Sequence, residues 1–218
     1  MPIDCRVFSE RQGKPMSNRP ANTIATLTIY YESYSGELTQ RGVSVTDFDE
    51  EQMTGLCHLR ERERTFRYDR VRSCSNAKTG EVVRNINQYL MEHYRQTVRY
   101  TLDVLYRNHP DALKVLLYVA KADGQVRAPE LKVVAGFLKV LTRDFRIDEG
   151  SARELLYCFD APSLHGFKVA VGRVAARGNA GTSRSLVLAC RAIVNTGKTI
   201  TAVEQEALDY LDKRLPIE

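Results

Sequence analysis

The sequence predicts an α+β protein in which a small antiparallel β-barrel precedes an all-helical bundle. Two observations lead to this prediction. Apolar residues alternate with a period close to two up to about residue 75, and past Gly80 they recur at steps of three and four. The chain has 218 residues, 43% of them hydrophobic, which is enough for one large core or two small ones.

The predicted β-module spans residues 23–75. It follows a polar arm over residues 1–22, which we expect to be flexible because it holds three prolines and no apolar pattern. Residues 24–32 and 38–46 are rich in Thr, Ile, Tyr and Val and flank Gly36, a pattern that predicts a hairpin. The segments "MTGLCHLR" and "RTFRYDRV" predict a second hairpin, joined across "ERE". Four or five strands are therefore expected.

The rest of the chain has a helical pattern. Residues 76–106 carry Val83, Ile86, Leu90 and further apolar residues at helical spacing, which predicts one or two helices that bridge the modules. Residues 107–218 predict a bundle of about six helices. Within it, "LLYVAKADGQVRAPELKVVAGFL" and "LACRAIVNTGKTITAVEQEALDYL" each predict a helix, a glycine turn and a second helix. This similarity indicates an internal repeat.

Composition limits the class of protein. Basic residues exceed acidic residues by 32 − 27 = 5, a mild preference for anionic partners. Five scattered cysteines without a C-x-x-C pair argue against a zinc site and a disulfide framework, and they predict a reducing, cytoplasmic location. The N-terminus lacks a signal-peptide core, and no apolar run reaches the roughly 18 residues of a membrane span. We expect no contact with a membrane.

The stretch "CHLRERERTFRYDRV", residues 57–71, contains five arginines and a histidine. Strand alternation places His58, Arg60 and Arg67 on the outer face, whereas Arg64 and Arg70 need a twist or bulge to join them. Arg62 is expected at the hairpin tip. One interpretation is a solvated face, because three carboxylates lie in the same stretch. The other is a site for a polyanion, because a planar guanidinium donates two hydrogen bonds to a phosphate at once.

Residues 24–71 resemble a WYL domain. The resemblance rests on "IYYESYSGELTQRGV", with Gly36, Glu37 and Arg41, and on the longer match "CHLRERERTFRYDRV". The Trp-Tyr-Leu that names the family is replaced here by "EQMTGL". The resemblance implies an SH3-like or Sm-like barrel that binds nucleic acid or a nucleotide-like ligand as a sensor in bacterial regulators and phage-defence proteins. It also implies a set of ligand contacts, namely Arg41, His58, Arg60, Arg64, Arg67 and Arg70.

Residues 107–218 resemble the TerB-like helical domain of tellurite-resistance proteins, on the basis of "AKADGQVRAPEL" and its weaker second copy. The resemblance implies a divalent-metal site that includes Asp123 and Glu130. A structural interpretation stays open beside it. Thr201 and Glu204 form a capping-box sequence, Glu130 can serve the same purpose at its own helix start, and Asp123-Gly124 is a favourable turn pair.

No catalytic constellation is found in the sequence. The four histidines do not cluster, and no Gly-x-Ser-x-Gly or Walker loop occurs. We therefore expect a non-enzymatic regulator without a required cofactor, whose basic barrel binds single-stranded nucleic acid or a nucleotide. The helical domain would report binding or contact a protein partner, and a homo-oligomer is an open alternative. The rival function is a metal-binding stress-response adaptor that acts through protein contacts.

Overall fold

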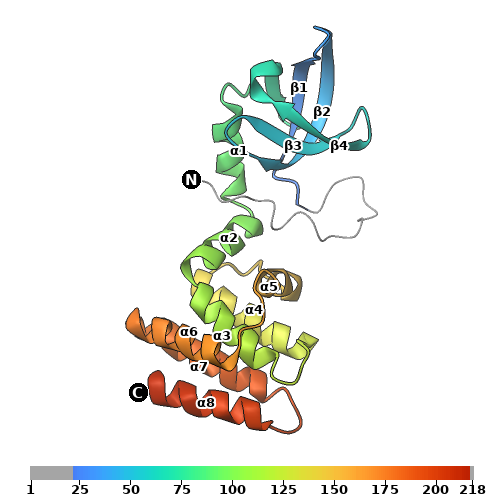
Figure 1. Cartoon of the computed structure of the whole chain (residues 1–218). Helices are drawn as coiled ribbons and strands as arrows, with labels where there is room; N and C mark the ends of the chain where they lie inside the picture. Colours follow the sequence, from blue (N-terminus) through green and yellow to red (C-terminus); the bar gives the residue numbers. More distant parts are fainter. Residues whose placement is uncertain (1–21, 217–218) are drawn as a thin grey trace. The chain divides into compact units, whose positions relative to one another are not determined.

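The chain divides into two units, and the division lies between Tyr100 and Thr101. The computed structural model describes residues 22–216. The predicted flexible arm therefore lies outside the described residues, apart from Asn22. In the described residues, a five-stranded antiparallel sheet precedes eight α-helices, so the predicted α+β class is confirmed (Figure 1).

The sheet has the strand order β4-β3-β2-β1-β5. Its strands are β1 (Ala25–Glu32), β2 (Leu38–Phe48), β3 (Gln52–Cys57), β4 (Arg62–Arg67) and β5 (Val71–Asn76). The first predicted hairpin is confirmed, because β1 and β2 pair from Ala25 opposite Val45 to Glu32 opposite Leu38. Gly36 takes a positive φ of 81° in the connecting turn, a conformation that glycine adopts without strain.

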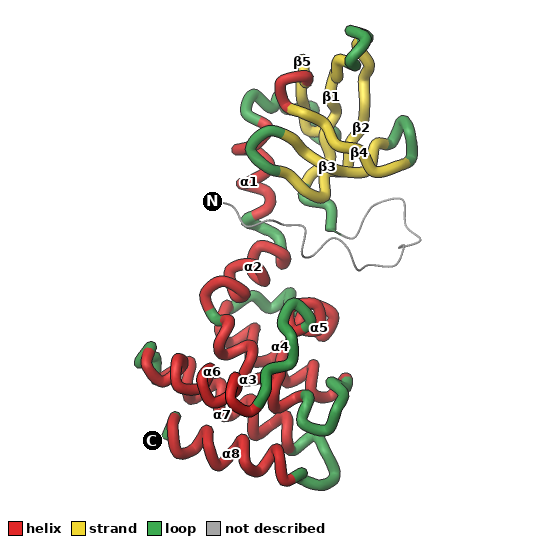
Figure 2. Tube along the Cα trace, in the orientation of Figure 1, coloured by secondary structure: helices red, strands yellow, loops and turns green. Residues whose placement is uncertain are grey.

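The predicted closure into a barrel is wrong. β4 and β5 are the two edges of the sheet, and no ladder joins them in the described part of the chain. The 3-10 turn η2 (Tyr68–Arg70) connects these edges. The apolar face is covered by a helix, because Leu90 of α1 (Ile86–Tyr94) belongs to the same buried cluster as Leu27 and Phe66 (Figure 2). Burial of the apolar face against α1 thus replaces strand pairing around a closed barrel.

The second predicted hairpin forms, but its turn lies earlier in the chain than expected. Residues 58–61 make the turn, and Cys57 pairs with Arg62. Arg62 is therefore a strand residue, and Arg60 lies in the turn, which reverses the two predicted positions. Glu61 has a positive φ of 50°, which reverses the chain direction within these four residues.

The second unit is helical. Its elements are most of α2 (Val98–Asn108), then α3 (Pro110–Ala120), α4 (Ala128–Thr142), α5 (Glu149–Leu156), α6 (Leu164–Ala176), α7 (Ala180–Val194) and α8 (Ala202–Arg214). The six helices from Pro110 onward in the described residues confirm the predicted number. α3 is the central helix, since it is apolar on nearly every side and contacts α5, α6 and α7. The predicted bridging segment, residues 76–106, holds α1 and most of α2.

In each of the two repeated helix pairs, a glutamate caps the start of the second helix, α4 or α8, as the structural interpretation of the sequence expects. Thr201 N–H donates to Glu204 at 2.7 Å, and the Thr201 hydroxyl accepts from Glu204 N–H at 3.2 Å. At the other start, Arg127 N–H donates to Glu130 at 2.6 Å. Each glutamate therefore satisfies a backbone N–H that the first helical turn leaves unpaired.

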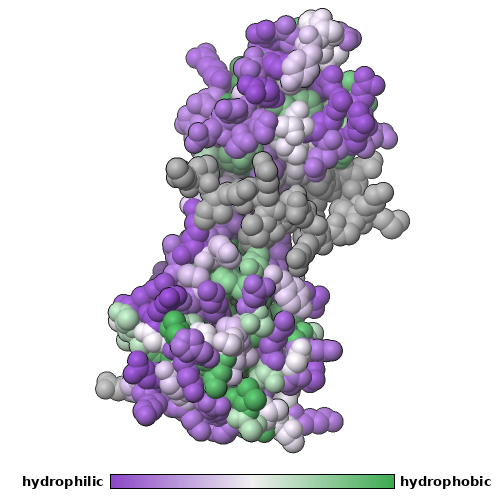
Figure 3. Space-filling model, in the orientation of Figure 1, coloured by the Kyte–Doolittle hydropathy of each residue, from purple (hydrophilic) through white to green (hydrophobic). Residues whose placement is uncertain are grey.

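The surfaces of the two units differ in composition. On the face shown in Figure 3, the sheet unit is mostly hydrophilic, whereas apolar residues reach the surface of the helical unit in several places. Exposed apolar residues of the helical unit include Val140, Phe145, Tyr157, Leu188 and Ile200. None of the helices in residues 22–216 combines the length and the apolar composition that a membrane crossing requires.

Candidate functional site

The candidate site is centred on Arg41 of β2. Arg41 lies opposite Ile29 of β1, on the face of the sheet that carries the apolar core, and 8% of its surface is exposed. Its Nε donates to the Thr39 hydroxyl at 3.0 Å. Among the described residues, no carboxylate forms an ion pair with Arg41. A cation is thus buried at this position without a negative partner from the described chain.

Arg70 shares an aromatic neighbour with Arg41. The Arg70 guanidinium carbon lies 3.7 Å from the centroid of the Tyr34 ring and 5.1 Å from that of Tyr31. The Arg41 guanidinium carbon lies 5.8 Å from the same Tyr31 ring. We call Tyr31, Tyr34, Arg41 and Arg70 the arginine–tyrosine cluster. Like Arg41, Arg70 has no ion pair among the residues that the structure describes.

Local sequence explains how the cluster assembles. Tyr31 is opposite Thr39 in β2 and Val71 in β5, so the residue that follows Arg70 is hydrogen-bonded next to Tyr31. The Tyr31 ring also meets Phe66 edge-on at 5.1 Å between ring centroids, which fixes its orientation. Tyr34 is 94% exposed, because the β1–β2 turn presents it to solvent.

The cluster offers the chemistry of an anion site. Two guanidinium groups lie near the centre of one aromatic ring, at 5.8 Å for Arg41 and 5.1 Å for Arg70, and a bound anion between them would be attracted by both charges. Their planar donors match the oxygen atoms of a phosphate, and the exposed face of an aromatic ring can stack on a nucleobase. Arg41 and Arg70 were predicted from the sequence as ligand contacts, whereas Tyr31 and Tyr34 were not. The signal was present, because both tyrosines lie in "IYYESYSGELTQRGV", the stretch that also contains Gly36 and Arg41.

His58 and Arg60 do not join this cluster. His58 Nε2 lies 2.9 Å from the Ser44 hydroxyl, and the ring packs against Gly42, on the face of β2 opposite to that of Arg41. Residues 42 and 44 alternate with Arg41 along the strand, which accounts for this separation. Arg60 lies exposed in the β3–β4 turn.

Arg64 and Arg67 lie on opposite faces of β4. Arg64 is half-buried opposite Gly55, on the same face as Phe66, as strict alternation requires. Arg67 is already neutralised, because it donates two hydrogen bonds to Asp69, at 3.2 and 3.1 Å, and lies 3.8 Å from Glu51. The hydrogen bond to Asp69 raises the pKa of Arg67, and the same bond lowers the pKa of Asp69. The charge of Arg67 is balanced by carboxylates of the protein itself, as expected for a solvated surface with ion pairs.

The predicted metal ligands have protein partners. Asp123 forms an ion pair with Arg127 at 2.8 Å, and Glu130 accepts the N–H of the same residue. Burial raises the pKa of Glu130, and the nearby charges of Asp123 and Glu204 act in the same direction. Within the described residues, no three His, Cys, Asp or Glu side chains come together as a metal-binding group. The arrangement is that of a helix start with a satisfied cap.

Comparisons with protein families, curated proteins and solved structures give no match for this chain. The resemblances to WYL and TerB-like domains therefore stay predictions.

Proposed function

We propose that this protein is a non-enzymatic sensor whose sheet unit binds a phosphate-bearing ligand, either single-stranded nucleic acid or a nucleotide. The observation that carries the proposal is Arg41, a residue that is 8% exposed and has no ion pair among the described residues. Burying an unpaired charge is unfavourable, so its retention is explained if an external anion completes the site.

Two further features support a nucleotide-like ligand over a simple ion. Arg70 supplies a second guanidinium over the Tyr31 ring that Arg41 also approaches, and Tyr34 supplies an exposed aromatic ring. Phosphate contacts from arginine combined with stacking on aromatic rings are the usual means of binding single strands without sequence preference. We also propose that residues 24–71 are related to WYL domains and that the TerB-like helical unit reports binding or contacts a protein partner. These two assignments rest on sequence resemblance.

The test is binding of labelled single-stranded DNA, RNA and mononucleotides over a series of salt concentrations. Affinity is expected to fall as salt rises, because the neutralised phosphates release counterions. Arg41→Met is expected to weaken binding about tenfold or more and to reduce the salt slope by about one unit. Arg70→Met is expected to act in the same direction.

Arg67→Met is the matched control, since it removes one arginine from the same unit at a position already paired with Asp69. We expect its affinity to stay within about twofold of the wild type. Equal losses for Arg41→Met and Arg67→Met would indicate diffuse attraction by the unit's charge. Failure of all three ligand classes to bind at low salt would remove the proposal.

The alternative function is a metal-binding stress-response adaptor. The observation that favours it is the electrostatic proximity of Glu130 to Asp123 and Glu204 at the two repeated helix starts. It requires that calcium, magnesium or zinc raise the melting temperature and that Asp123→Ala abolish the rise. We expect no rise in the wild type, because Arg127 already pairs with Asp123 and donates its N–H to Glu130.

A further inference from the structure

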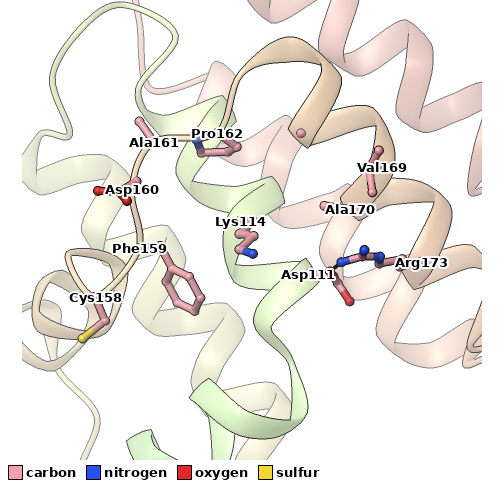
Figure 4. A pocket seen from close by; sticks show the side chains of 11 residues that line it. Asp111, Lys114, Cys158, Phe159, Asp160, Ala161, Pro162, Val169, Ala170 and Arg173 are labelled. Atoms are coloured by element: carbon pink, nitrogen blue, oxygen red, sulfur yellow. Dashed lines mark ion pairs between the residues drawn. The ribbon is translucent and has the colours of Figure 1, made fainter. Parts of the chain in front are cut away.

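The helical unit contains a pocket of about 440 Å³. It lies between α3, α6 and the loop that connects α5 to α6 (Figure 4). Its volume is in the range of about 300–1,000 Å³ that is typical of sites for small molecules. All lining residues belong to the helical unit, so the pocket is separate from the arginine–tyrosine cluster.

One part of the pocket is apolar. Val169 and Ala170 of α6 line it together with Phe159 of the loop. The Phe159 ring packs against Tyr106 at 4.9 Å between ring centroids, so a neighbouring aromatic side chain holds it in place. These groups form a surface against which the apolar body of a ligand can be buried.

The other part is positively charged. Asp111 is buried and binds two arginines, Arg177 at 3.0 Å and Arg173 at 3.6 Å. One carboxylate thus faces two guanidinium groups, and the longer contact leaves donors of Arg173 open to the pocket. Lys114 adds a further cation, whose Nζ lies 5.9 Å from the centroid of Phe159 and which has no ion pair among the described residues.

Two acidic residues line the pocket, and one of them, Asp111, is shared by Arg173 and Arg177. Asp160 belongs to the lining, but its side chain points away from Lys114 and Arg173 (Figure 4). Lys114 and Arg173 are carried by different helices that pack directly against each other, α3 and α6. Two cations are therefore held at a pocket whose lining also includes the apolar side chains of Phe159, Val169 and Ala170.

We propose that this pocket binds a small organic anion, in which a carboxylate or phosphate monoester contacts Lys114 and Arg173 and an apolar body of about the size of a phenyl ring lies against Val169, Ala170 and Phe159. Charge-assisted hydrogen bonds fix the anion, and burial of the apolar body supplies the remaining affinity. The helical unit then has an effector site of its own, which does not depend on the ligand of the sheet unit.

The experiment is a titration of the full-length protein with benzoate, phenyl phosphate and the uncharged benzyl alcohol. Binding is followed by methyl NMR signals of Val169 and Ala170. Saturable shifts with benzoate, phenyl phosphate or both, and at least tenfold weaker binding of benzyl alcohol, are expected. The two anions distinguish a carboxylate from a phosphate ligand. No saturable shift with either anion, or equal binding of benzyl alcohol, would overturn the proposal.

Three variants locate the site. Lys114→Met and Arg173→Gln are each expected to weaken anion binding about tenfold, and Asp111 keeps Arg177 as its partner in the second variant. Val169→Trp fills the pocket from a partly exposed helix position and is expected to abolish the shift of Ala170. Lys132→Met removes an exposed cation of α4 and serves as the charge control. An equal loss for Lys132→Met and Lys114→Met would show that no local site exists.

Discussion

Arg41 is the residue at which proposed function and stability oppose each other. Its side chain is largely buried on the face of the sheet that carries the core, where an apolar side chain of similar length would be desolvated at a lower free-energy cost. The proposed anion site is therefore retained at the expense of stability, as is common for functional residues.

Arg41→Met is accordingly expected to leave the free energy of unfolding unchanged or to raise it by about 1 kcal/mol, although it weakens ligand binding. Urea unfolding of the wild type and the variant, without ligand, measures this difference. Arg67→Met, which breaks an exposed ion pair, is expected to change the free energy of unfolding little, because solvent screens the pair. A loss of about 3 kcal/mol or more for Arg41→Met would identify Arg41 as a structural residue.

Asp144 is the carboxylate on which the acid stability of the helical unit depends most clearly. It accepts hydrogen bonds from the Arg146 guanidinium at 2.9 and 2.8 Å and from the Thr101 hydroxyl at 2.8 Å. The hydrogen bond from Arg146, followed by that from Thr101, holds the pKa of Asp144 well below its usual value. Through its bond to Thr101, Asp144 connects the first residue of the helical unit to the loop after α4.

Asp144→Asn is expected to lower the free energy of unfolding by about 1–3 kcal/mol near neutral pH. A depressed folded-state pKa gives stability that is present above the ordinary value of 3.8 and is lost as the pH falls through the folded-state pKa. The difference between wild type and variant should therefore shrink below pH 3.8. Urea unfolding over a pH series tests this, with the exposed Asp160→Asn as control. A difference that is constant down to the lowest pH would exclude the linkage.

At the scale of single elements, the sequence predicted the strands better than their connections. Alternation predicts that Arg64 and Phe66 share one face of the strand and that Arg67 lies on the other, and the structure agrees. Alternation does not determine where a hairpin turns, because it shows which residues of one strand share a face and not which residues of two strands pair. His58 is the first residue of the observed turn, and its ring contacts Ser44 of β2. A contact between residues so far apart in the sequence is not visible in a local pattern.

Gly55 is the position in the sheet that tolerates a side chain least. A Cβ atom at Gly55 would lie 2.2 Å from the Ser44 carbonyl oxygen, which belongs to the backbone of β2 and cannot rotate away. Gly55→Ala is therefore expected to push β2 and β3 apart and to lower the free energy of unfolding of the sheet unit by about 1–3 kcal/mol or more.

Gly36→Ala is the matched control for this prediction. Gly36 has open space around it and only a positive φ, so its substitution adds backbone strain of about 1 kcal/mol without a collision. Thermal unfolding of both variants, followed by circular dichroism, compares the two effects. A smaller loss for Gly55→Ala than for Gly36→Ala would mean that the strands separate at little cost.

For the whole molecule, the change in hydrophobic period near Gly80 correctly predicted a β part and a helical part, but it did not locate their division. The division lies at Tyr100, inside α2, where one helix runs on without a break in its pattern. The barrel prediction failed for a related reason. Leu90 completes the sheet core from a helix that the sequence assigned to a bridge, and periodicity does not show which surface a helix covers.

Two separate cores predict two separate unfolding events. The sheet and α1 share one buried cluster, whereas α3 and the helices around it form another. Calorimetry of the full chain is expected to show two transitions. A saturating 5′-phosphorylated oligothymidylate should raise only that of the sheet unit, on the order of 10 °C at a hundredfold excess over its dissociation constant. Benzoate should raise only that of the helical unit. One shared transition, or equal shifts of both with either ligand, would show that the units unfold as one.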